Sequence, residues 1–134
     1  MIAQAFSQYK NNDEVIIFAS GVSNSGEEQN SEYDREFNLL KSQLPTDKKL
    51  IYFSTVSIFD PDYVNKKYIS HKLKIESFIA FNFSNYIIFR LPIVVGKTDN
   101  SHTFFNYMKD KIIRGEEITI YKNANRYLID IDEI

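Results

Sequence analysis

Short runs of apolar residues alternate with segments of helical periodicity along this chain, and that alternation limits its fold more than any other feature. The runs are Val15–Ala19, Leu50–Phe53 and Tyr86–Phe89. Such uninterrupted apolar runs are typical of strands that are buried on both faces. The order strand, helix, strand, helix, strand predicts an α/β fold in which a mostly parallel sheet has helices on both faces.

The segments between and after these runs carry apolar residues at helical spacing. Helices are expected from Ser31 to the residue before Pro45, over Tyr68–Ala80, and over Thr103–Arg114 with Gly115 as its C-cap. The residues expected on the inner faces of the first two helices are Tyr33, Phe37, Leu40, Leu44, Ile69, Leu73, Phe78 and Ile79. Two further extended segments are predicted at Glu117–Tyr121 and Tyr127–Ile131.

Length and composition narrow the classes of function. The 134 residues are predicted to form one domain, 1–134. Sixteen basic residues against eighteen acidic ones, without a basic cluster, argue against a nucleic-acid or membrane partner. No apolar run approaches the ~20 residues of a membrane span, so a cytoplasmic location is expected. The chain has no cysteine, and its two histidines, His71 and His102, are read as exposed, so no metal site is expected.

The predicted strands end at Ser20–Gly21, Ser54–Thr55 and Leu91–Pro92. In open parallel sheets the ligand binds outside the carboxyl ends of the strands, so a site is expected at this edge. Tyr68 and Lys72 follow at the start of a predicted helix, four residues apart and therefore on one face. A lysine ammonium beside a tyrosine hydroxyl stabilises the phenolate and prepares the tyrosine for acid–base catalysis.

Five segments resemble, in the right order, those of the extended short-chain dehydrogenases/reductases that act as NAD-dependent sugar-nucleotide epimerases and dehydratases. They are Leu50–Pro61, Lys72–Glu76, Ile88–Gly96, Arg114–Tyr121 and Asn125–Asp132. The resemblance runs from about residue 15 to residue 134. It implies a Rossmann-like fold and an enzyme that uses NAD or NADP on a nucleotide-activated sugar.

The resemblance also implies roles for individual residues. Thr55, Tyr68 and Lys72 match the catalytic residues, and Tyr68 and Lys72 also match cofactor contacts. The other positions that match cofactor contacts are Phe18, Ala19, Ser20, Gly21, Leu91, Pro92 and Val94. Ser57 and Arg126 match substrate-binding positions, with Arg126 suited to a phosphate group.

Two positions bear on the type of reaction. Dehydratases of the family carry Asp-Glu after the catalytic threonine, whereas this chain has Val56 and Ser57 there. Ser57 also stands where related epimerase-reductases keep a cysteine acid. The remaining expectation is 4-epimerisation or 4-keto reduction, as in the synthesis of surface polysaccharides.

The family's glycine-rich phosphate turn is absent from this sequence, in which the first glycine is Gly21. We therefore expect a Rossmann-like domain that lacks its first glycine-rich βα unit or units, truncated at the N-terminus, with weak or no NAD(P) binding. One alternative is a non-catalytic sugar-nucleotide-binding or assembly module that has lost the cofactor half. Another is an unrelated α/β domain of flavodoxin-like type. The expected partner is a nucleotide sugar, and a homodimer stays open.

Overall fold

The computed structural model describes residues 1–98, 103–120, 122 and 125–134. These residues form two compact units, one of Ile2–Leu91 and one of Pro92–Ile134 together with Met1. Each unit is described by itself. Within the described ranges, no helix combines the length and the apolar character that crossing a membrane requires.

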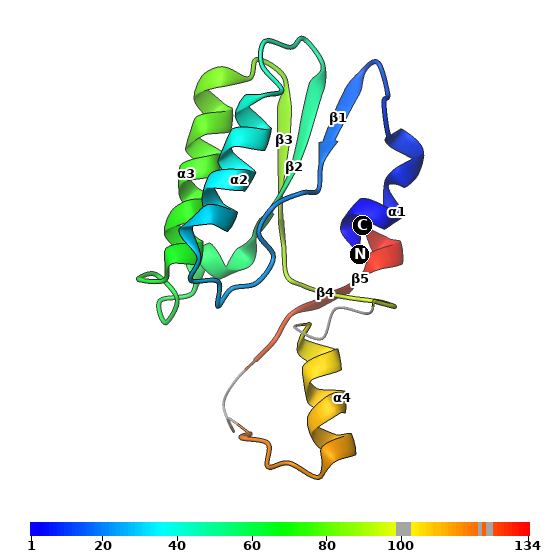
Figure 1. Ribbon diagram of the computed structural model, residues 1–134, viewed down its shortest axis with the longest axis vertical. Helices are drawn as coiled ribbons and strands as arrows, with labels where there is room; N and C mark the ends of the chain where they lie inside the picture. The colour runs from blue at the N-terminus through cyan, green and yellow to red at the C-terminus, as the bar shows by residue number, and fades with distance from the viewer. Residues whose placement is uncertain (99–102, 121, 123–124) are drawn as a thin grey trace. The chain divides into compact units, whose positions relative to one another are not determined.

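The first unit is built on a three-stranded parallel sheet (Figure 1). Its strands are β1 (Val15–Phe18), β2 (Lys49–Thr55) and β3 (Tyr86–Leu91), in the order β1-β2-β3. Both pairings are parallel, so all three strands end at the same edge. The predicted α/β fold with a parallel sheet is therefore confirmed.

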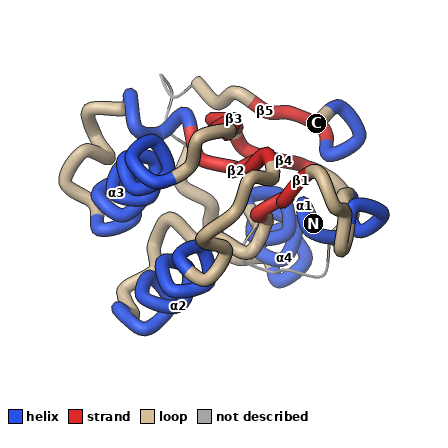
Figure 2. Tube along the Cα trace, turned by 90° about the horizontal axis from the view of Figure 1, so that it is seen from above, coloured by secondary structure: helices blue, strands red, loops and turns tan. Residues whose placement is uncertain are grey.

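Two long helices, α2 (Asn30–Lys41) and α3 (Lys67–Asn82), cover one face of this sheet (Figure 2). The core lies between them and the strands, and its fully buried members are Leu40, Leu50, Tyr52, Ile75 and Ile79. These residues come from α2, β2 and α3, so packing of the two helices against the central strand holds the unit together.

The opposite face of the sheet is covered more lightly. The N-terminal segment contains the short helices α1 (Ile2–Ala5) and η1 (Ser7–Tyr9). Phe6, between them, stacks on Phe53 of β2 with 5.5 Å between ring centroids. On β3, Ile87 and Phe89 stay 39% and 45% exposed. Helical segments thus flank both faces, but only the α2–α3 face is closed.

The inner face of α3 differs from the predicted one. Leu73, expected to face inward, is 43% exposed, and His71, expected at the surface, is 8% exposed. Both expectations were wrong because the helix buries a polar stripe. Its polar members are His71, Lys72 and Glu76. Apolar periodicity alone places polar side chains in solvent. The buried face that it predicts for α3 is therefore not the face that the structure buries.

The second unit pairs strand β4 (Ile93–Val95) in parallel with β5 (Leu128–Asp130). It also holds helix α4 (Phe104–Arg114) and a final turn, η3 (Ile131–Glu133). Gly115 ends α4 in the left-handed conformation, with φ 66°, as the sequence predicted. Residues 117–120 form no strand, contrary to prediction, while Tyr121 and His102 lie outside the described residues.

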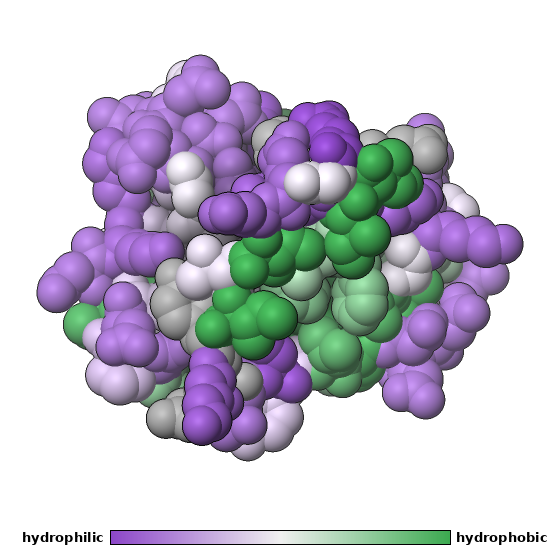
Figure 3. All heavy atoms as spheres, turned by 90° about the horizontal axis from the view of Figure 1, so that it is seen from below, coloured by the Kyte–Doolittle hydropathy of each residue, from purple (hydrophilic) through white to green (hydrophobic). Residues whose placement is uncertain are grey.

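Helix α4 carries apolar side chains on its surface. Those that are more than two fifths exposed are Phe104, Phe105, Tyr107, Ile112 and Ile113. Hydrophobic side chains also gather on the face of the molecule that Figure 3 presents. The sequence predicted the apolar stripe of this helix.

The core assignment can be tested with two neighbouring leucines of α2. Leu40 is fully buried and Leu39 is 40% exposed. Leu40→Ala should lower the free energy of unfolding by about 2–5 kcal/mol, because it opens a cavity in the core. The matched control, Leu39→Ala, should change it by less than about 1 kcal/mol. Urea unfolding measures both, and equal losses would contradict the assignment.

Candidate functional site

Thr55 and Tyr68 meet at the edge where the strands end. Thr55 is the last residue of β2, and its hydroxyl accepts a hydrogen bond from the Ser57 N–H at 3.1 Å, which begins the short helix η2 (Val56–Phe59). Tyr68 is the second residue of α3 and is 8% exposed. A side-chain hydrogen bond with Thr55 is among the influences on the Tyr68 pKa. The connection through η2 therefore returns the chain so that the two hydroxyls lie together.

Lys72 lies one helical turn behind Tyr68. Its ammonium donates to the Tyr52 hydroxyl at 2.9 Å and to Glu36 Oε1 at 3.1 Å. It lies 5.7 Å from the centroid of the Tyr68 ring. Lys72 is only 2% exposed, so it faces the protein interior and not solvent. The structure thus places Thr55, Tyr68 and Lys72 in one region, with the lysine bound by partners that the sequence had not indicated.

Glu36 of α2 is the residue that sequence reasoning missed. Its carboxylate is fully buried and accepts four hydrogen bonds. The donors are the Val22 N–H at 2.7 Å, the Tyr52 hydroxyl at 2.7 Å, His71 Nε2 at 2.9 Å and Lys72 Nζ at 3.1 Å. A charged residue at an otherwise apolar helical position was the only signal in the sequence. Glu36 thereby connects α2 to the segment after β1, to the central strand and to α3.

The pKa values in this cluster follow from burial and charge. Burial disfavours the Glu36 carboxylate, but His71, Lys72, Tyr52 and the Val22 N–H outweigh it and lower the Glu36 pKa to about 2. Burial raises the Tyr68 pKa to about 12, the charge of Glu36 adds to this, and the hydrogen bond with Thr55 opposes it. Burial lowers the pKa of Lys72, although Glu36 favours its charged form. Tyr68 is therefore a neutral phenol at neutral pH.

The end of β1 passes directly over this cluster. Phe18 is buried, Ala19 and Ser20 follow, and the Ser20 carbonyl accepts a hydrogen bond from Arg35 Nη1 at 3.2 Å. At Gly21, an added Cβ would come within 2.8 Å of Glu36 Oε1 and 2.9 Å of Lys72 Nζ. A side chain at this position would therefore have to displace the buried ion pair, which occupies that space.

The other residues with expected roles are divided between the two units. Leu91 ends β3 as the register partner of Thr55, and Ser57 lies in η2. Pro92, Val94 and Arg126 belong to the second unit. Arg126 donates from Nη1 to the Asn125 carbonyl at 3.1 Å. The site geometry described for the first unit therefore includes only residues up to Leu91.

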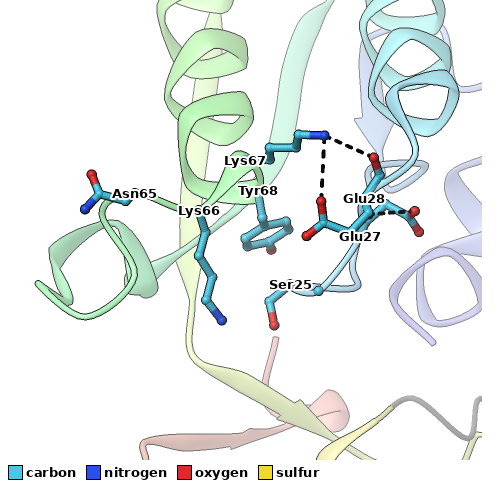
Figure 4. A pocket seen from close by; sticks show the side chains of 8 residues that line it. Ser25, Glu27, Glu28, Asn65, Lys66, Lys67 and Tyr68 are labelled. Carbon is cyan, nitrogen blue, oxygen red and sulfur yellow. Dashed lines mark hydrogen bonds and ion pairs between the residues drawn. The ribbon is translucent and has the colours of Figure 1, made fainter.

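A shallow pocket of about 330 Å³ opens beside Tyr68 (Figure 4). The residues that line it are Ser25, Gly26, Glu27, Glu28, Asn65, Lys66, Lys67 and Tyr68. The Tyr68 ring lies between the start of α3 and the Ser25–Glu28 loop, and Lys67 Nζ reaches Glu28 Oε2 at 3.7 Å (Figure 4). Two lysines and two glutamates balance in charge, so the pocket suits a polar group that carries no strong net charge.

A second buried carboxylate lies further along α3. Glu76 accepts hydrogen bonds from Ser54 Oγ at 2.6 Å and from Arg90 Nη2 at 2.7 Å. Its hydrogen bonds connect α3 to β2 and β3. Among the described residues there is no group of three or more His, Cys, Asp or Glu side chains that could hold a metal ion.

Comparisons with known proteins point to the fold. No protein-family model and no curated protein sequence matches this chain. Among solved structures it is similar to the capsular polysaccharide assembling protein CapF of Staphylococcus aureus, with a TM-score of 0.56 and 20% sequence identity. The match covers 96% of this chain but only 36% of that one. The likeness supports a Rossmann-like α/β fold, which is the class that the parallel sheet and its helices define.

The unusually acidic Glu36 predicts how stability depends on pH. Its pKa is about 2 in the folded chain against an ordinary value of 4.5. Its stabilising contribution is therefore complete above pH 4.5 and is lost as the pH falls through about 2. This shift corresponds to roughly 3 kcal/mol.

Glu36→Gln should be less stable at neutral pH and should lose less further stability on acidification. Urea unfolding from about pH 5 to about pH 2 compares the two slopes. Parallel loss of stability in the wild type and the variant would show that Glu36 does not govern the acid response.

Proposed function

We propose that this chain provides the acid–base centre of an NAD(P)-dependent epimerase or 4-keto reductase that acts on a nucleotide-activated sugar in polysaccharide biosynthesis. The observation that carries the proposal is the meeting of Thr55, Tyr68 and Lys72 at the carboxyl edge of a parallel sheet. A tyrosine with a hydroxyl neighbour and a cation one turn behind can hold and release a proton at a sugar oxygen.

The similarity to CapF adds support for the biological setting. That protein is described as a capsular polysaccharide assembling protein, and the structural match to it covers 96% of this chain. Because this chain spans 36% of CapF, the activity of the larger protein comes to it only as part of the proposal.

Support for cofactor binding comes from the kind of groups that the site offers to the nicotinamide–ribose end. An ammonium has three N–H donors, and Lys72 uses two of them. Within the described part of the chain, the third N–H has no hydrogen-bond partner, and Gly21 leaves this side of Lys72 without a Cβ. A bound NAD(P) would supply or accept the hydride. Since Lys72 is 2% exposed, a ribose would reach it only after the end of β1 moves.

The protonation state of Tyr68 favours one direction of reaction. With a pKa of about 12, its phenol carries its proton at neutral pH. It is therefore ready to donate that proton to an oxygen that becomes an alkoxide, which is the step that a keto reduction requires. Epimerisation also needs Tyr68 as a base, for which the phenol must first become more acidic.

A second candidate function is a non-catalytic module that binds or assembles sugar nucleotides. The enclosure of Lys72 by Glu36 and Tyr52 favours it, because a lysine used in this way serves the core and not a ligand. The two candidates differ in whether hydride transfer accompanies sugar-nucleotide binding.

Cofactor affinity is expected to be low for this chain. Without a glycine-rich turn, the diphosphate lacks two or three charge-assisted hydrogen bonds of roughly 1.5–3 kcal/mol each. That loss moves a micromolar site to about millimolar or weaker. Fluorescence titration with NADH and NADPH measures it, and binding in the low micromolar range would reveal another phosphate cradle.

Hydride transfer tests the proposed function directly. At millimolar NADPH, a panel of UDP-, GDP- and dTDP-linked 4-keto sugars should include one that oxidises the cofactor. Tyr68→Phe should reduce the rate by about 100-fold or more, because the proton donor is removed. The control is Tyr63→Phe, which changes a nearby tyrosine that is not one of Thr55, Tyr68 and Lys72. This variant should retain the rate.

Sugar-nucleotide binding with no cofactor oxidation in any reaction would favour the binding module over the enzyme. Equal loss of rate in the two tyrosine variants would remove Tyr68 from its proposed role.

A further inference from the structure

Glu36 of α2 binds groups from the segment after β1, from β2 and from α3, and all four of these hydrogen bonds are buried. Its Oε1 binds the Tyr52 hydroxyl and Lys72 Nζ, while Oε2 binds the Val22 N–H and His71. Each carboxylate oxygen thus holds two donors, and its full burial excludes water from replacing them. A carboxylate in this position fixes the place and the charge of what it contacts.

Lys72 depends on Glu36 for its position and for its positive charge. Burial of an ammonium group is unfavourable unless it is paired, and Glu36 is the carboxylate within hydrogen-bonding distance. The Tyr52 hydroxyl completes a triangle, since it donates to Glu36 and accepts from Lys72. Together these contacts hold the cation 5.7 Å from the Tyr68 ring centroid.

We propose that Glu36 is a positioning residue, which holds Lys72 as a cation behind Tyr68 and ties it to the segment after β1 through the Val22 N–H. This inference rests on the proposed function for its catalytic meaning, but the placement of Lys72 can be tested without cofactor or sugar. Glu36 reaches no substrate itself and acts through Lys72.

The charge of Lys72 is the property to measure. The titratable groups around it are Glu36 from α2, Tyr52 from β2, and Tyr68, His71 and Glu76 from α3. In Glu36→Gln the amide keeps the size of the side chain but removes the negative charge. Burial, which already lowers the Lys72 pKa, then acts with less opposition.

NMR titration of the lysine side-chain nitrogens in the full chain gives the readout. In the wild type, Lys72 should lose its proton at a lower pH than the exposed lysines. In Glu36→Gln its acid dissociation constant should rise at least about tenfold further, which equals about 1.4 kcal/mol. An unchanged constant for Lys72 in this variant would overturn the proposal.

Two further variants serve as controls for this experiment. Glu76→Gln is the matched control, because it also converts a buried carboxylate into an amide. Glu76 accepts hydrogen bonds from Ser54 and Arg90 and not from Lys72. This variant should shift Lys72 clearly less. Tyr52→Phe removes a hydroxyl that accepts from Lys72 and serves if Glu36→Gln does not fold. A shift of the Lys72 titration to lower pH in Tyr52→Phe supports the proposal that the Glu36–Tyr52 contacts hold Lys72 as a cation, and no shift contradicts it.

The pH profile of NADPH oxidation tests separately whether the positioning of Lys72 matters for catalysis. With Glu36→Gln, the basic limb should move to lower pH together with the Lys72 titration, while the KM for the sugar nucleotide stays within about twofold. A limb that stays in place while Lys72 shifts would overturn the positioning role. Absence of cofactor oxidation in the wild type would instead overturn the proposed function and leave the Lys72 titration to be judged alone.

Discussion

A single buried carboxylate organises the first unit of this protein. Glu36 accepts hydrogen bonds from the backbone of the segment after β1, from the central strand and from two adjacent residues of α3. Burying an ion pair is costly, and replacing such pairs with apolar residues is often neutral or stabilising. Removing one partner alone, however, leaves an uncompensated charge and costs about 3–5 kcal/mol. Glu36 and Lys72 therefore depend on each other, and both restrict the orientation of α2 against α3.

The polar cluster explains local features that would otherwise look unrelated. Gly21 has no room for a side chain because the ion pair lies under it. His71 is buried because Glu36 accepts its hydrogen bond and Tyr33 packs on its ring with centroids 4.7 Å apart. The Tyr68 pKa is raised in part by the same carboxylate. The electrostatic setting of the candidate site is thus an arrangement of the core and not of the surface.

Sequence patterns were sufficient for the parallel sheet and for the strand edge at which Thr55 ends β2. The runs at β1 and β2 supply core residues, whereas Tyr86, Ile87 and Phe89 of β3 stay 39%, 39% and 45% exposed. The parallel order of the three strands follows from the helices between them. The sequence could not show what Glu36 binds, because the partners that satisfy its charge lie 14 to 36 residues away in the chain. The same non-local pairing buried Lys72 in place of Leu73 and turned α3 away from its predicted orientation. Residues 117–120 carry a β pattern, yet pairing in the second unit is made by β5 instead.

The hydroxyl pair and its charged surroundings differ in how far along the chain they are gathered. Thr55 and Tyr68 are joined by η2 and one loop, so a contiguous stretch of backbone brings them together. Lys72 obtains its counter-charge from α2, on the far side of β2 in sequence. Transplanting the stretch from β2 to α3 into another scaffold would carry over the two hydroxyls and the lysine, but not the acidity or basicity they have here. In this protein the chemical groups are portable, whereas their reactivity belongs to the assembled fold.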